Sequence, residues 1–157
     1  MSERFLSEMV FPGERWVVPV ARRCVGSILL GAGYPEDVDN AQLIVSELVT
    51  NALQHTASGC AGGLVAVDVL GVGGQLARIE VTDDGADTVP RPRLSDDLDS
   101  RGRGLRLVAR LSTAWGVRAL GGRQLTVWSE FPMVMHAAHL CEATSNALTR
   151  EIEGRAG

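Results

Sequence analysis

The chain has 157 residues, of which 45% are hydrophobic and 22% are charged, and its formal net charge is −4. These values indicate one compact globular domain with a hydrophobic core. They argue against direct nucleic-acid binding, because the balance is acidic and no stripe of lysine and arginine follows a phosphate backbone. Cys24, Cys60 and Cys141 are far apart in the chain, and their spacing indicates neither zinc nor redox chemistry.

No segment of the sequence predicts a membrane attachment. The apolar stretch at 62–74 is interrupted by Asp68 and by several glycines. The first residues carry charges where a signal peptide would need an apolar region. We therefore expect a cytoplasmic protein.

The first half of the chain predicts a strand and two helices. Residues 4–11 alternate loosely and end at Pro12, which favours a strand. From Pro19 onward, apolar residues at helical spacing predict a helix that ends near 31–33. Its apolar positions are Val20, Cys24 and Ile28. A second helix is predicted over 39–56, where apolar residues share one broad face. They are Ile44, Val45, Leu48, Val49, Ala52 and Leu53.

The second half predicts two β-hairpins around a short helix. Strands are expected at 64–70 and 76–82, around the glycine-rich turn 71–74, and at 115–120 and 123–131, around Gly121 and Gly122. One apolar face predicts the helix at 105–111, and residues 86–101, with prolines and an acidic cluster, predict a loop. Apolar residues at helical spacing predict a final helix at 133–153.

These elements predict the fold class and the domain organisation. The class is α+β, a two-layer α/β sandwich in which helices cover one face of a mixed, mostly antiparallel sheet. Residues 1–132 would form the domain, and residues 133–157 would be a C-terminal helical extension of it.

One edge of the helix predicted at 39–56 carries polar groups. Glu47 and Asn51 are four residues apart, so they project from the same side one turn from each other, and His55 continues the row. A carboxylate at this place could accept a proton, and a carboxamide could be a neutral oxygen ligand for a hard cation such as Mg²⁺. The alternative interpretation is a solvated polar edge without chemistry.

Two other segments carry residues suited to a nucleotide. A carboxylate at a strand end can accept from an exocyclic amine, which distinguishes adenine from guanine, and Asp83 fits this role. Asp84 competes for it, and a turn-capping aspartate is the alternative. Gly85 would let the backbone approach a flat ring. Gly102 and Gly104 open the predicted short helix, where free backbone N–H groups can hold phosphate.

These three segments, in this order, resemble the motifs of the GHKL ATP-binding superfamily, which includes gyrase, histidine kinases and mismatch-repair ATPases. ELVTNALQH at 47–55 resembles the N box, DDGAD at 83–87 the G1 box and GRGL at 102–105 the G2 box. The similarity covers about residues 17–131. The G1 box usually has glycine where this chain has Asp87. The small size and the segments SELVTNA and TVWSEFP are most similar to the anti-sigma-factor serine/threonine kinase branch.

The resemblance implies a Bergerat-type ATP-binding fold, with ATP and Mg²⁺ as cofactors and with residues 86–101 as a lid over ATP. It implies that Glu47 is the general base, that Asn51 binds Mg²⁺ and that Asp83 recognises adenine. The other ATP-binding residues that it implies are Gly85, Gly102, Gly104, Leu105 and Thr126. Thr126 stands where the family has a threonine that joins the adenine-binding water network.

The resemblance also implies partners. In this branch, the γ-phosphoryl group passes to a serine or threonine of a STAS-domain anti-anti-sigma protein, and the kinase alternatively sequesters a sigma factor. A second hypothesis is an ATP-sensing anti-sigma binding module with little or no kinase activity, and a third is a domain that has lost ATP binding. The helix predicted at 133–153 would either mediate a homodimer or cover its own sheet.

Overall fold

The computed structural model describes residues 2–34, 38–86 and 100–134, apart from the side chains of residues 100–102. The elements along the chain are β1 (Glu3–Pro12), α1 (Val17–Gly31), α2 (Val38–His55), the short 3-10 helix η1 (Ala57–Gly59), β2 (Leu64–Val72), β3 (Leu76–Asp83), α3 (Ser100–Leu111), β4 (Ala114–Gly121) and β5 (Gln124–Pro132). Most of the loop predicted at 86–101 and of the helix predicted at 133–153 lies outside the described residues. Within these ranges, every helix is too short or too polar to cross a membrane.

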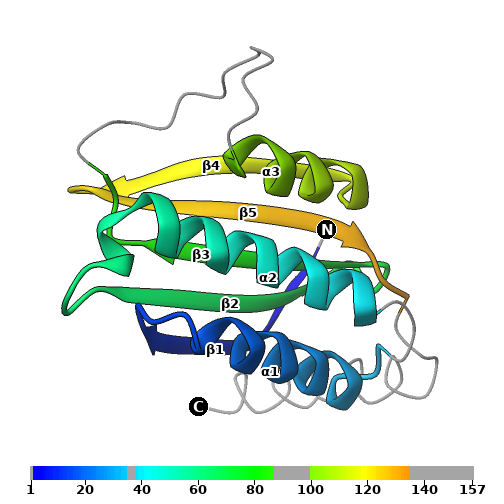
Figure 1. Cartoon of the computed structure of the whole chain (residues 1–157). Coiled ribbons are helices and arrows are strands. Elements are labelled where there is room, and N and C mark those ends of the chain that lie inside the picture. Colours follow the sequence, from blue (N-terminus) through cyan, green and yellow to red (C-terminus); the bar gives the residue numbers. More distant parts are fainter. Residues whose placement is uncertain (1, 35–37, 87–99, 135–157) are drawn as a thin grey trace, which may run out of the picture.

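The strands form one sheet with the order β1-β2-β3-β5-β4, and α1, α2 and α3 cover one of its faces (Figure 1). This confirms the predicted α+β sandwich. All four strand pairs in the described sheet are antiparallel, so the expectation of a mixed sheet is corrected to an antiparallel one. The reason is that each predicted glycine turn closes a hairpin, while β5 returns beside β3.

Alternation along β3 shows how the sheet separates its two faces. Ala77, Ile79 and Val81 are buried in the core beneath the helices. Arg78 and Thr82 lie on the opposite face, because successive strand residues point to opposite sides. On the helix side of this core, α2 contributes buried residues, which are Ile44, Val45, Leu48, Val49 and Ala52. The predicted apolar face of this helix is therefore confirmed, except that Leu53 is half-buried.

The buried face of α1 differs from the predicted one. Val20, Cys24 and Ile28 are half-buried, whereas the fully buried row lies one position further along the helix. That row is Val17, Ala21, Val25 and Leu29. Both rows are apolar at helical spacing, so the sequence alone does not rank them. Contacts of α1 with α2 and with the sheet determine which of the two rows is buried.

Strand β2 runs two residues further than predicted, into the segment assigned to the glycine turn. Gly71 pairs with Ala77, and Val72 pairs with Leu76. A Cβ at position 71 would collide with the Tyr34 hydroxyl, so glycine is needed here for close packing. The turn itself uses Gly73 and Gly74, both with positive φ.

The sheet face opposite the helices carries a chain of ion pairs around Arg78. Its guanidinium donates to Glu130 through Nε at 2.8 Å and contacts Glu3 at 2.8 Å and Glu80 at 3.5 Å. It also lies over the Trp128 ring, 5.8 Å from the centroid. The Arg78 side chain is only 18% exposed, so these charges are partly shielded from water.

We expect Arg78→Met to lower the free energy of unfolding by about 2 kcal/mol, because Glu130 then keeps a partly buried charge without its partner. Arg118→Met is the matched control. Arg118 pairs with Glu80 alone among the described contacts and is 50% exposed, so its loss should cost less than about 1 kcal/mol. Urea unfolding of both variants measures the difference, and equal effects would contradict the central position of Arg78.

Candidate functional site

Helix α2 lies beside both of the other motif segments. Its C-terminal end is next to the end of β3, while α3 begins beside the middle of α2 (Figure 1). A hydrogen bond of 2.7 Å from the Ala57 N–H to the Gly85 carbonyl joins the residues after α2 to those after β3. This bond places the second motif segment at the C-terminal end of α2.

Glu47 faces α3 across a very short gap. A Cβ built on Gly104 would lie 2.6 Å from Glu47 Oε2, so the carboxylate occupies the space that any side chain at position 104 would need. Glu47 and Asn51 are both half-buried at the border of the α2 core face. The structure thus brings Glu47 and Gly104 together, and Asn51 follows one turn further toward the end of β3.

The two glycines of the third segment do not open their helix as predicted. Helix α3 begins at Ser100, so Gly102 lies in its first turn and Gly104 in its second. The N–H of Gly102 is among the groups that an α-helix leaves without a helical partner, but that of Gly104 is not. The phosphate-binding expectation therefore fits Gly102, whereas Gly104 provides room for Glu47. Leu105 packs against the core.

Asp83 combines burial with an available acceptor. It is 5% exposed, and its Oδ1 accepts from the Gly85 N–H at 2.7 Å. Among the described residues this N–H is its single hydrogen-bond partner, so Oδ2 can accept from a ligand. Burial raises the pKa of Asp83 above its ordinary value; the Gly85 hydrogen bond opposes this shift, and the nearby charge of Asp84 adds to it.

Asp84 is engaged elsewhere. Its Oδ2 accepts from the Leu64 N–H at 2.8 Å, and its own N–H donates to Ser58 Oγ at 2.9 Å. This arrangement favours Asp83 over Asp84 as the ligand-facing carboxylate. Gly85 has a φ of 78°, and a Cβ there would collide with the Arg123 backbone. Glycine at this place is therefore required by the turn itself.

Thr126 lies on the other side of the sheet from Asp83. Thr82 and Thr126 are cross-strand partners, and their hydroxyls are 2.8 Å apart. Since Thr82 and Asp83 are neighbours in β3, they point to opposite faces. The structure thus pairs the Thr126 hydroxyl with Thr82, and the role in an adenine-binding water network that the resemblance implies stays a prediction. Leu125 is the residue opposite Asp83 on the helix-covered face.

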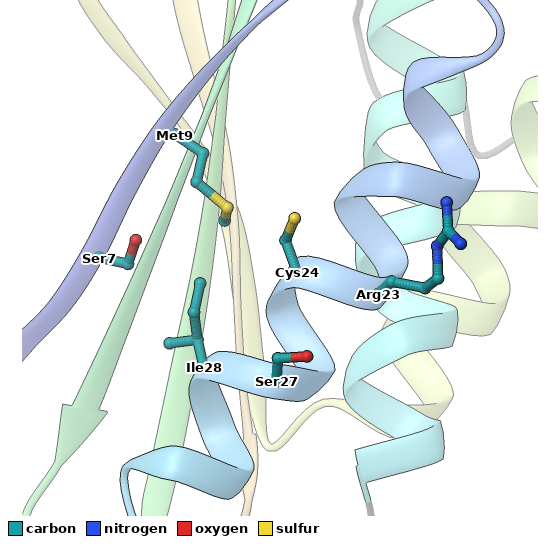
Figure 2. A pocket seen from close by; sticks show the side chains of 6 residues that line it. All are labelled: Ser7, Met9, Arg23, Cys24, Ser27 and Ile28. Atoms are coloured by element: carbon teal, nitrogen blue, oxygen red, sulfur yellow. The ribbon is translucent and has the colours of Figure 1, made fainter.

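Two surface hollows are lined by residues outside the three motif segments. One, of about 410 Å³, lies between β1 and α1 and is lined by Met9, Cys24 and Ile28 together with polar residues (Figure 2). The other, of about 300 Å³, lies between residues 12–14 and 59–64. Neither is lined by Glu47 or Asp83.

The fold, with helices on one face of an antiparallel sheet, is of the Bergerat type. Residues 14–129 match the family of histidine kinase-like ATPase domains. The match covers most of the chain, and the protein belongs to this family.

The comparison with solved structures agrees in fold. The chain is similar to the RsbU and RsbW domains of Rv1364c from Mycobacterium tuberculosis, with a TM-score of 0.55 and 18% sequence identity. The similarity covers 81% of this chain and 32% of the other, so this chain spans about a third of that one. No curated protein matches the sequence.

Sequence reasoning missed Ser58. This fully buried serine contacts both Asp84 and Leu64. Its only signal in the sequence was its place two residues after the predicted helix, and a serine there is ordinary for a helix end.

Proposed function

We propose that this protein binds ATP with Mg²⁺ and transfers the γ-phosphoryl group to a serine or threonine of a STAS-domain anti-anti-sigma protein. The observation that carries the proposal is the contact between Glu47 on α2 and Gly104 on α3, within a family match that spans all three motifs. A carboxylate held beside the segment that would carry the phosphates is placed to act on an attacking hydroxyl.

The chain's own residues fit ATP and its metal by their chemistry. Bound Mg²⁺ would neutralise phosphate charge, and the Asn51 amide oxygen is a hard donor of the kind that shares such an ion with phosphates and water. Glu47 would accept the proton of the attacking hydroxyl. Asp83 Oδ2 would accept from the exocyclic amine of adenine, while Gly102 would offer its N–H, which has no partner within α3, to phosphate.

A second candidate function is an ATP-sensing module that binds a sigma factor and transfers little or no phosphate. It uses the same ATP site, so the residues of that site support both candidates. Phosphoryl transfer depends mainly on positioning and on electrostatic stabilisation. The place of Glu47 beside Gly104 favours the kinase, because phosphoryl transfer to a hydroxyl uses a proton acceptor near the phosphates, whereas nucleotide binding alone does not need one.

Two measurements test the proposal. Calorimetry with ATP and Mg²⁺ should show binding to the purified protein. Incubation with γ-labelled ATP and a panel of STAS-domain proteins from the same organism should then label one of them. Tight binding to a sigma factor without any labelled partner would support the second candidate, and no heat with ATP would reject both.

We expect Gly104→Ala to reduce the rate of phosphoryl transfer by about 10- to 100-fold, because the new methyl group displaces the Glu47 carboxylate and small misplacements are costly in catalysis. Stability should be kept or raised, since alanine favours a helix interior by about 1 kcal/mol. Labelled-phosphate transfer and thermal melting measure the two effects.

Gly31→Ala is the matched control for this substitution. Gly31 ends α1, and a Cβ there would meet nothing within 4 Å. It should leave the transfer rate unchanged. If Gly104→Ala kept full activity, the contact between Glu47 and position 104 would have no role in the reaction.

A further inference from the structure

The connection between α2 and β2 is bonded to the turn that follows β3, and Ser58 is at the centre of this contact. Ser58 is 0% exposed. Its hydroxyl donates to the Leu64 carbonyl at 2.6 Å and accepts from the Asp84 N–H at 2.9 Å. One buried hydroxyl therefore joins the start of β2 to the peptide group directly after Asp83.

Two more hydrogen bonds join the same segments. The Ala57 N–H donates to the Gly85 carbonyl at 2.7 Å, and the Leu64 N–H donates to Asp84 Oδ2 at 2.8 Å. Together with the Ser58 bonds, they fix Asp84 and Gly85, the two residues after Asp83, through partners that are not part of this turn. The direction of the Asp83 side chain thus depends on a backbone that the α2–β2 connection fixes.

Ser58 is itself held firmly. Its N–H donates to Thr56 Oγ1 at 3.1 Å, and the Thr56 hydroxyl donates to the Ala52 carbonyl at 2.7 Å. The Ser58 carbonyl lies so close to Gly13 and Gly63 that a Cβ at either position would collide with it. Ser58 therefore cannot shift without moving the end of α2 or the start of β2.

We propose that Ser58 is a positioning residue for adenine recognition, whose hydroxyl fixes the peptide after Asp83 and so directs the Asp83 carboxylate at the exocyclic amine of the base. The inference rests on the proposed function, because it needs Asp83 to accept from adenine. A single hydrogen bond to the amine is directional and weakens steeply when its acceptor turns away. Loss of the Ser58 hydroxyl should therefore affect the contact to the amine more than the contacts to the phosphates.

The test compares two ligands that differ in this amine. ATP and purine riboside triphosphate, which lacks the exocyclic amine, are titrated by calorimetry with Mg²⁺ into the wild-type protein and into Ser58→Ala. The Kd for ATP should rise about tenfold, the loss expected for one weakened hydrogen bond. The Kd for the analogue should stay within about twofold, because that ligand never uses the amine contact.

Ser112→Ala is the matched control. The Ser112 hydroxyl also makes two hydrogen bonds, to the Val108 carbonyl at 2.5 Å and with Ser129 Oγ at 2.7 Å, but it lies just beyond the other end of α3. It should change neither Kd. If Ser58→Ala does not fold, Thr56→Val replaces it, because this variant removes the acceptor of the Ser58 N–H while keeping the side-chain shape.

The outcomes separate the inference from the proposed function. Unchanged ATP binding in Ser58→Ala, or an equal loss for both ligands, would show that Ser58 only stabilises the fold. A wild-type protein that binds no ATP would instead overturn the proposed function, and the role of Ser58 with it.

Discussion

Asp83→Asn is expected to weaken ATP binding, measured by calorimetry, by at least about 100-fold. The carboxylate is buried, and its Oδ2 would accept from the exocyclic amine of adenine. An asparagine that keeps its amide oxygen on the Gly85 N–H turns its NH₂ group toward that amine, so two donors face each other. The lost charge-assisted bond alone is worth about 3 kcal/mol.

The same variant should not be less stable than the wild type at pH 7. Burial raises the pKa of Asp83 in the folded protein, so keeping the group charged opposes folding. This penalty is absent below the unfolded pKa of about 3.9 and grows as the pH rises through the folded pKa. Asparagine removes the penalty, and thermal melting at pH 4 and pH 7 should show the advantage of the variant only at the higher pH.

Asp84→Asn is the control that separates the two neighbouring carboxylates. An amide oxygen can still accept from the Leu64 N–H, so ATP affinity should fall less than about threefold. If this variant lost ATP binding and Asp83→Asn kept it, the assignment of the adenine-binding carboxylate would be reversed.

Glu47→Gln is expected to reduce phosphoryl transfer by about 100- to 10,000-fold while ATP binding stays near the wild-type level. Glutamine has nearly the shape of glutamate but cannot accept the hydroxyl proton, and general-base catalysis commonly contributes a factor of this size. The rate is measured as single-turnover transfer from γ-labelled ATP to the STAS-domain protein that the panel identifies. Calorimetry measures the affinity of the variant for ATP.

Asp39→Asn controls for the change of charge. Asp39 is exposed in the first turn of α2, at the opposite end of the same helix from the site. It should leave transfer unchanged. A Glu47→Gln protein that still transferred phosphate at the wild-type rate would assign the proton acceptor to another group and remove the main support for the kinase proposal.

Much of the fold was predictable because its elements have strong local signals. The apolar face of α2 and the glycine turns of the two hairpins placed these elements within two residues of their observed bounds. The convergence of Glu47 with the glycine segment was also predictable, although only from the order of three motifs. None of the three segments is distinctive alone.

The sequence is least informative where tertiary contacts determine the structure. The face on which Thr126 points depends on the pairing of β3 with β5, and a shift by one residue would invert it. The start of α3 follows a segment without periodicity, so its first turn was missed. Gly71 was read as part of a turn because the sequence does not show that the Tyr34 hydroxyl fills the space beside it.

The strand order β1-β2-β3-β5-β4 has a consequence for folding. The hairpins β2–β3 and β4–β5 are local, but Thr82 and Thr126, which are neighbours in the sheet, are 44 residues apart in the chain. Joining the two hairpins requires closure of this long loop, the step that slows folding in proteins with distant contacts. During synthesis, β3 gains its second neighbour only after β5 has left the ribosome, and until then β3 is an open edge of the nascent sheet.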